Sequence, residues 1–207
     1  ARRMALRALL RGGAGLGPRG AAVRLASRPV CLTHQGRTPV VDKTALIAVT
    51  ATVLGDVEVG AGSSVWYNCT LRGDVAQIKI GRRSNIQDNT VIHVSSAELG
   101  KQGPMPTIVG DDVTVGHAAL LHGCTLEDRS FVGMGAIVMD GAVVSSGGML
   151  AAGALLSAGK RVGPGELWGG RPAKLMRLLQ PGEVDFITRS ADSYVQFAET
   201  HKDVKLP

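Results

Sequence analysis

Aliphatic residues recur at every sixth position through the middle of this chain, and few folds accommodate that period. They occupy four runs, at Val53, Val59, Val65 and Leu71; at Ile80, Ile86 and Ile92; at Val109, Val115 and Leu121; and at Leu126, Val132, Val138, Val144, Leu150, Leu156 and Val162. Neither the 3.6-residue period of a helix nor the alternation of an ordinary strand gives this pattern. A hexapeptide repeat does, because each hexad forms a short strand and a tight turn, and three hexads close one triangular coil of a parallel β-helix. The runs predict roughly six coils.

The composition agrees with a solenoid built around an aliphatic core. The 207 residues include 28 glycines, which suit tight corners, and only 3% are aromatic. Stacked Val, Ile and Leu side chains fill a narrow β-helix without large rings. A β-sandwich of short strands is the alternative, but it would not keep one period over so long a stretch. We therefore expect an all-β solenoid of one domain with terminal extensions.

Three histidines lie at informative places in this repeat. His93 and His122 each follow the last aliphatic position of a coil, so we expect them one coil apart on the same outward row, about 4.8 Å apart in backbone position. His117 follows the middle position of its coil, belongs to the preceding face and should point away from the pair. Three histidines with an open position for water are typical of a catalytic zinc site. A three-fold assembly would bring His117 of one subunit to the histidine pair of its neighbour.

Six motifs accompany the histidines and carry a resemblance. They are Leu71-Arg72-Gly73-Asp74, Asn85-Ile86-Gln87-Asp88-Asn89, Val91-Ile92-His93, Val113-Thr114-Val115-Gly116-His117, Leu121-His122-Gly123-Cys124 and Val132-Gly133-Met134-Gly135. From about Thr38 to Arg177 the chain resembles the gamma-class carbonic anhydrases, and most closely their subunits in mitochondrial respiratory complex I of plants, algae and some protists. The resemblance implies a left-handed parallel β-helix with a C-terminal α-helix, assembled as a trimer with a metal at each subunit interface.

The resemblance also implies the metal and its ligands. The family holds Zn²⁺, or Fe²⁺ or Co²⁺ in some members, at the positions that correspond to His93, His117 and His122. Zinc lowers the pKa of bound water to about 7, so hydroxide becomes available to attack carbon dioxide near neutral pH. Cys124 lies two residues after His122, and we weigh it as a fourth ligand. With Cys31 and Cys69 it forms a scattered set that favours reduced thiols.

Four further residues are candidates for the catalytic site by resemblance. The family's arginine and aspartate at Arg72 and Asp74 support the subunit interface, and its glutamine and aspartate at Gln87 and Asp88 form hydrogen bonds around the metal-bound solvent and the interface. Surrounding groups of this kind orient ligating imidazoles. Simple interface ion pairs are the alternative role for the charged residues among them.

The chain departs from the best-known active enzyme of the family at its acidic residues. That enzyme has a glutamate directly after its Arg-Gly-Asp and a second one that shuttles protons. Here Val75 follows the Arg-Gly-Asp, and the inserted segment 95–106 offers only Glu98. Carbonic anhydrase turnover needs a route for the released proton. We therefore expect a metal site with slow turnover.

The two ends of the chain differ from its middle. The first 41 residues hold eight arginines and no Asp or Glu, so the net charge of +6 belongs to this leader and does not indicate nucleic-acid binding. An Arg-rich, acid-free start is typical of mitochondrial targeting. Interleaved Met4, Leu6, Leu9 and Leu10 suggest an interfacial helix that contacts a membrane subunit or anionic lipid, with an uncleaved targeting peptide as the alternative. No apolar run is long enough to span a membrane.

We divide the chain into a basic N-terminal extension (1–37), a β-helix (38–168) and a C-terminal helical segment (169–207). In the last part, the stretch from Pro181 to about Lys202 has one apolar side and predicts a helix that braces the solenoid.

The expected function follows from the resemblance. We expect a carbonic anhydrase subunit on the matrix side of the inner mitochondrial membrane, peripheral to it, that hydrates carbon dioxide reversibly. Its partners would be copies of itself or related subunits in a trimer, and membrane-arm subunits of complex I. One alternative is a non-catalytic assembly subunit whose metal stabilises the trimer. Another is a hexapeptide acyltransferase, which shares the fold but does not need three histidines with Arg-Gly-Asp and Asn-Ile-Gln-Asp.

Overall fold

The structure, a computed structural model, describes residues 30–96 and 103–204. Its elements are β1 (Val30–Leu32), β2 (Val40–Val41), β3 (Leu46–Ile47), β4 (Thr52–Val59), β5 (Ser64–Val65), β6 (Thr70–Ile80), β7 (Asn85–Ile86), β8 (Val91–His93), β9 (Thr107–Val109), β10 (Thr114–Val115), β11 (Leu120–His122), β12 (Thr125–Leu126), β13 (Phe131–Val132), β14 (Ile137–Val138), β15 (Val143–Val144), β16 (Met149–Leu150), β17 (Leu155–Leu156), β18 (Arg161–Val162), β19 (Glu166–Gly170), β20 (Ala173–Leu178) and α1 (Pro181–His201).

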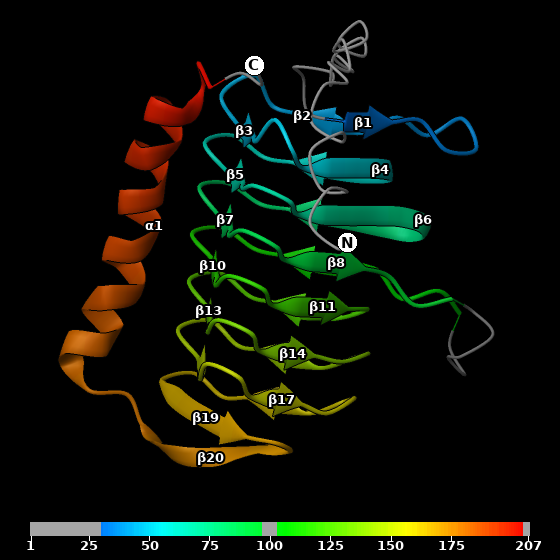
Figure 1. The fold of residues 1–207 in the computed structure, drawn as a ribbon. Helices are drawn as coiled ribbons and strands as arrows, with labels where there is room; N and C mark the ends of the chain where they lie inside the picture. Colours follow the sequence, from blue (N-terminus) through cyan, green and yellow to red (C-terminus); the bar gives the residue numbers. More distant parts are fainter. Residues whose placement is uncertain (1–29, 97–102, 205–207) are drawn as a thin grey trace, which may run out of the picture.

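These short strands stack as the coils of a parallel β-helix (Figure 1). From β7 to β16 each strand pairs in parallel with the strand three places along the chain, as β8 does with β11 and β11 with β14. One face runs through β3, β5, β7, β10, β13, β16 and β19. The long β6 turns a corner, because its first residues pair with β8 and its last with β9, so it joins the other two faces. The predicted solenoid of three-sided coils is confirmed.

The core is the aliphatic repeat itself. Every repeat position from Val53 to Val162 is at most 1% exposed. Extra residues bulge out where the six-residue period is broken. The longer insertion closes through a pair of backbone hydrogen bonds between Ser95 and Met105, each 3.0 Å long. The insertion thus leaves the stacking intact, because the chain re-enters the ladder at β9.

The corners use left-handed backbone conformations at the same six-residue spacing. From Arg129 to Gly165 every sixth residue has a positive φ, and all of them after Arg129 are glycines. Glycine adopts this conformation without steric cost. Ala118, directly after His117, also has a φ of 56°, which alanine rarely adopts. The corner that presents His117 is therefore held by its neighbours in the ladder rather than by local preference.

Helix α1 begins as the sequence predicts and runs along one side of the solenoid (Figure 1). The backbone N–H of Gln180 donates to Glu183 Oε2 at 2.8 Å, and Arg177 binds the same carboxylate through two nitrogens at 2.7 and 2.9 Å. Ile187 and Ala198 are buried against the sheet face. None of the helices in residues 30–96 and 103–204 has the length and apolar character needed to cross a membrane.

Two strands lie where the six-residue period says nothing. β1 falls within the segment set apart as an N-terminal extension, and it pairs in parallel with β4. β20 follows the last coil and pairs antiparallel with β19, closing that end of the solenoid with a hairpin (Figure 1). Residues 1–29 of the extension, with the predicted interfacial helix, lie outside the described residues.

The stacked core predicts a sharp difference between two neighbouring leucines on β11. Leu121 is fully buried, whereas Leu120 is 38% exposed on the outer surface. We expect Leu121→Ala to lower the free energy of unfolding by about 2–5 kcal/mol, because it removes core packing and leaves a cavity. Leu120→Ala should cost about 1 kcal/mol or less. Urea unfolding of both variants measures this, and equal losses would contradict the assigned register.

The start of α1 predicts a specific acid dependence. Hydrogen bonds from the Arg177 guanidinium and the Gln180 backbone hold the pKa of Glu183 at about 2, below its ordinary 4.5. Because the folded pKa is lowered, this contribution to stability is complete above about pH 4.5 and is lost as the pH falls toward 2. We expect Glu183→Gln to lower the melting temperature at pH 7, by an amount that shrinks between pH 4.5 and 2.

Glu199→Gln is the matched control for this measurement, because Glu199 pairs with Lys202 at the other end of the helix. A difference between wild type and Glu183→Gln that stays constant with pH would show that the carboxylate charge is not what stabilises the helix start.

Candidate metal centre

The ladder between β8 and β11 brings two histidine side chains together. His93 and His122 are directly paired in register, as the repeat predicts. Nδ1 of His93 lies 3.2 Å from Nε2 of His122. Zinc binds imidazole nitrogen at about 2.0–2.1 Å in a tetrahedron, which sets its nitrogen ligands roughly 3.3 Å apart. The two nitrogens are therefore spaced as two ligands of one metal ion.

Each of these histidines has a carboxylate on its other ring nitrogen. Nε2 of His93 lies 2.9 Å from Asp74 Oδ1, and Nδ1 of His122 is hydrogen-bonded to Asp140 Oδ1. Metal-ligating histidines almost always donate their second ring N–H to such a partner, which fixes the tautomer and the ring orientation. The arrangement leaves one nitrogen of each ring directed at the other ring. The donor set thus fits a metal ion.

Arg72 and Asp74 lie together beside this pair. Arg72 Nη1 is hydrogen-bonded to Asp74 Oδ2, and the second oxygen of the carboxylate contacts His93. Burial raises the pKa of Asp74, but the hydrogen bonds from His93 and Arg72 outweigh it and hold the pKa below its ordinary value. Asp74 is therefore ionised at neutral pH and can accept the N–H of His93.

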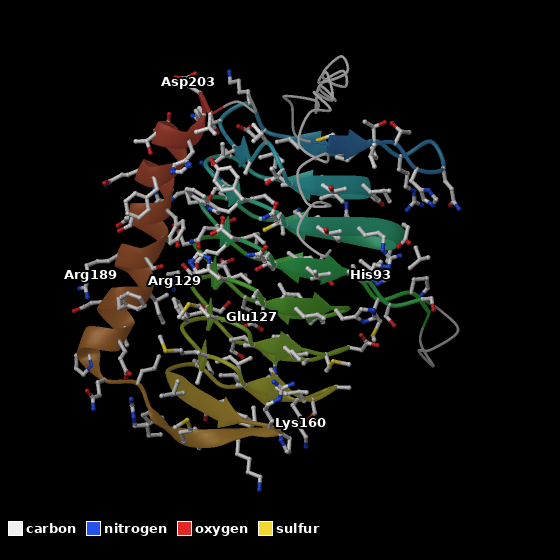
Figure 2. All side chains as sticks on the ribbon, viewed as in Figure 1. His93, Glu127, Arg129, Lys160, Arg189 and Asp203 are labelled. Carbon is white, nitrogen blue, oxygen red and sulfur yellow. The ribbon has the colours of Figure 1, made fainter. Side chains whose placement is uncertain are left out.

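His117 lies on a different face of the solenoid. It follows β10, in the sheet that faces α1, whereas His93 and His122 end strands of the other sheet. Figure 2 shows His93 on the side of the solenoid away from α1. The side chain of His117 is 43% exposed, and its Nδ1 lies 2.8 Å from Asp88 Oδ2. Within the described parts of one subunit, no three His, Cys, Asp or Glu side chains gather to hold a metal ion.

Gln87 lines the same groove as His117, and a series of hydrogen-bonded polar side chains holds it in place. Gln87 is buried, and its Nε2 donates to Asn85 Oδ1 at 3.0 Å. Asn85 in turn donates to Thr114 Oγ1 at 2.9 Å, and Thr114 is hydrogen-bonded to Ser190 of α1 at 3.0 Å. These hydrogen bonds orient the Gln87 amide with its nitrogen toward Asn85. The sequence pattern assigns no role at the site to Thr114 or Ser190.

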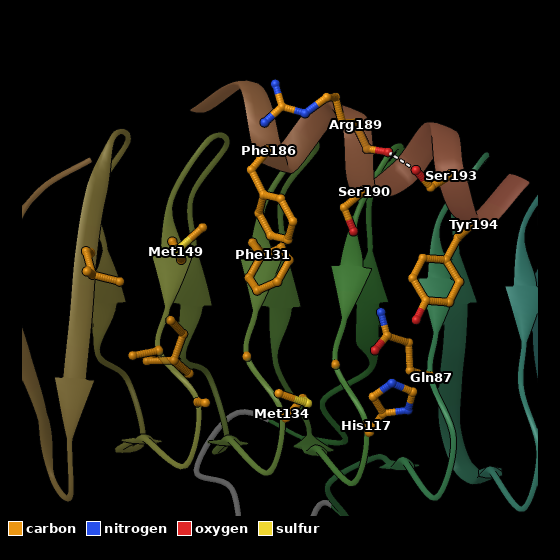
Figure 3. A pocket seen from close by; sticks show the side chains of 16 residues that line it. Gln87, His117, Phe131, Met134, Met149, Phe186, Arg189, Ser190, Ser193 and Tyr194 are labelled. Carbon is orange, nitrogen blue, oxygen red and sulfur yellow. Dashed lines mark hydrogen bonds between the residues drawn. The ribbon is translucent and has the colours of Figure 1, made fainter. Parts of the chain in front are cut away.

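A groove of about 590 Å³ runs from this corner along the helix. Figure 3 shows Gln87 and His117 at one end of it, and Phe131 beneath Phe186 of α1 farther along. Most of its lining is apolar, and Met134, one coil below His117, is 58% exposed. The groove is thus an open apolar surface that leads directly to the third histidine.

Cys124 does not have the properties of a metal ligand. It belongs to the hydrophobic core, and burial raises the pKa of its thiol to about 12. Cys69 is likewise buried, and burial raises the pKa of its thiol to about 11. Thiolate is the form that binds metal. Both cysteines are therefore protonated core residues at neutral pH.

The burial of these thiols predicts how the three cysteines react with a thiol reagent. Cys31 is exposed, so in the native protein only Cys31 should be modified rapidly by dithionitrobenzoate. Cys69 and Cys124 should react only after a denaturant is added. Mass spectrometry of the digested protein assigns each modified site. Rapid modification of Cys124 in the native protein would show that its thiol turns toward solvent, and Cys124 would again be a candidate metal ligand.

The fold and the site together define a hexapeptide-repeat β-helix protein with a histidine site of metal-binding type. No family model matches the chain. The chain is 50% identical over 165 residues to gamma carbonic anhydrase 2, mitochondrial, of Arabidopsis thaliana, and this match covers 80% of the chain and 59% of the plant protein. The chain therefore spans about three fifths of the length of that relative.

Shorter relatives are matched over most of their length. The carbonic anhydrase of Geobacillus kaustophilus is 41% identical, over 82% of this chain and 89% of its own. The crystal structure of a hexapeptide transferase family protein from Anaplasma phagocytophilum superposes with a TM-score of 0.77 at 46% identity, covering 83% of this chain and 98% of that one. The chain belongs to the gamma-class carbonic anhydrase family.

Proposed function

We propose that this chain is a gamma-type carbonic anhydrase subunit that interconverts carbon dioxide and bicarbonate at a zinc site shared between subunits. The observation that carries the proposal is the pair of imidazole nitrogens 3.2 Å apart on His93 and His122, each ring oriented by a carboxylate on its far nitrogen. A structural histidine pair would not need this arrangement. Relatives named carbonic anhydrase support the same assignment.

The third ligand in this proposal is His117 of a neighbouring subunit. Its Nδ1 already has a partner in Asp88, so Nε2 is the nitrogen that remains for a metal. A trimer would also cover the apolar groove and Met134, because large apolar patches on the surface mark protein interfaces. The partners would be copies of this chain or related gamma carbonic anhydrase subunits.

The chemistry divides between the metal and the protein. Bound zinc supplies a Lewis acid that makes hydroxide available from water near neutral pH. The chain's residues hold and orient: Asp74 positions His93, and Arg72 fixes Asp74. Asn85 aligns the Gln87 amide, and in this proposal that amide forms a hydrogen bond with a substrate oxygen where His117 of one subunit meets its neighbour. Gln87 and Asp88 then support the site from the His117 side.

Proton release is the weak part of this site. Val75, which stands where the best-known family enzyme has a glutamate, is 45% exposed and cannot carry a proton. Glu98 lies outside the described residues. A general acid or base speeds proton transfer by typically 10²–10⁴-fold. Because Val75 cannot transfer a proton, we expect turnover slower than that of fast carbonic anhydrases.

Val75 in place of the family's glutamate also favours a second candidate function. In it, the chain is a structural or assembly subunit of the complex I membrane arm, and the metal site stabilises the trimer rather than turning over substrate. Relatives named mitochondrial support a mitochondrial location for either function. A peripheral position on the matrix side, and contact of the N-terminal extension with lipid, belong to the same proposal. A hexapeptide acyltransferase is a weaker hypothesis than either of these functions, because it gives no role to the histidine–carboxylate pairs.

The test is the metal content of the purified assembly, followed by carbon dioxide hydration assays. We expect up to one zinc per subunit by elemental mass spectrometry. His117→Ala should lose most of the metal and the hydration activity, because one of three ligands is removed. His34→Ala is the control, since His34 lies in a turn before β2 and should keep both.

Each result separates the candidate functions. Metal retained in His117→Ala would contradict the shared site. Metal without hydration activity would favour the assembly subunit. A metal-free wild-type assembly, prepared without chelators, would contradict both forms of the metal-site proposal.

A further inference from the structure

The carboxylate of Asp140 has both its oxygens engaged at the histidine pair. Asp140 follows β14, one coil beyond His122. Its Oδ1 is hydrogen-bonded to His122 Nδ1, and its Oδ2 accepts a hydrogen bond from Ser95 Oγ at 3.1 Å. A carboxylate held from two sides cannot rotate freely. The side chain is therefore a fixed acceptor for the His122 ring.

The backbone around Asp140 leaves room for this contact. Gly123 stands between His122 and Asp140, and a Cβ there would lie 3.0 Å from Asp140 Oδ1 and 3.1 Å from Ser95 Cβ. The N–H of Gly141 donates to the carbonyl of Gly123 at 2.7 Å, which fixes the spacing of the two corners. A side chain at position 123 would crowd the path of the carboxylate. The geometry at Asp140 thus depends on three separate parts of the chain.

Asp140 also completes a pattern across the three histidines. Asp74 contacts His93 and Asp88 contacts His117, and both aspartates lie in motifs that the resemblance had already singled out. Asp140 lies in neither motif, but it gives His122 the same kind of partner. Because a carboxylate accepts and does not donate, it selects the tautomer of His122 that has its proton on Nδ1. Nε2 is then bare and faces His93.

We infer that Asp140 is a positioning residue that holds His122 with Nε2 directed at the metal position and thereby sets the affinity of the site. The hydrogen bond to His122 stands on the structure of this chain, while the effect on metal affinity rests on the proposed function. Loss of such a partner typically weakens metal binding 10–100-fold.

Two measurements on the full-length protein test the inference with the variant Asp140→Asn, which keeps the shape of the side chain. The first is the tautomer of His122 in metal-free protein, by ¹⁵N NMR at about pH 9, where an ordinary imidazole is neutral. Wild type should carry the proton on Nδ1. Asp140→Asn, which no longer offers a charged acceptor, should populate the other tautomer. A wild-type His122 without a proton on Nδ1 would overturn the inference whatever the metal does.

The second measurement is zinc affinity, by competition with a chromophoric chelator. Asp140→Asn should bind zinc about 10–100-fold more weakly than wild type. The matched control is Asp128→Asn, because Asp128 Oδ1 accepts the backbone N–H of Asp111 at 2.8 Å at another corner. The control should stay within about twofold of wild type, and metal-free melting temperatures of the two variants check that both fold. Equal zinc affinities in the two variants would overturn the inference.

The two readouts also separate this inference from the proposed function. Wild-type protein that shows the Nδ1 proton but binds no zinc would refute the metal site, and with it the effect on affinity. The same result would support the orienting bond between Asp140 and His122. Tautomer and affinity that both change only in Asp140→Asn would support the whole inference.

Discussion

Parallel backbone hydrogen bonding between successive coils places each side chain of one coil over its counterpart in the next. The spacing of about 4.8 Å between strands leaves little freedom in where a side chain lies relative to its neighbour one coil away. The buried aliphatic row holds this ladder in register, because a one-residue slip would turn the whole row outward. The approach of His93 and His122 is a direct consequence, since the two residues directly follow paired core positions.

The polar residues of the site are stacked by the same ladder, but their side chains lie outside the core. Each of the three histidines contacts an aspartate from another coil of the chain. Arg72 holds Asp74, Ser95 holds Asp140, and the backbone N–H of Tyr67 donates to Asp88. Partly buried charges of this kind are stabilised by hydrogen bonds that also fix their direction. The solenoid therefore supplies rigid strands and the side chains supply orientation, which is what a metal ligand set requires.

Helix α1 packs beside the His117 side of the site. It packs its buried residues over the sheet that contains β7 and β10, and Ser190 reaches the polar chain that ends at Gln87. The helix also forms one wall of the apolar groove that leads to His117 (Figure 3). A neighbouring subunit that filled this groove would contact the helix and the third histidine together. The brace and the interface would then be one structural element.

The amino-acid sequence by itself determined the solenoid, its core and the pairing of His93 with His122, because a fixed period states which residues stack wherever the ladder is unbroken. It also located α1, whose start has its own local signals at Pro181 and Glu183. The tertiary structure alone decided on Asp140, on the polar chain from Gln87 to Ser190, and on strands β1 and β20. These contacts join residues across corners, insertions or separate elements, where no period applies. An acid one coil after His122 was a usable signal for Asp140, but only the folded chain shows that Gly123 leaves its carboxylate room to reach the ring.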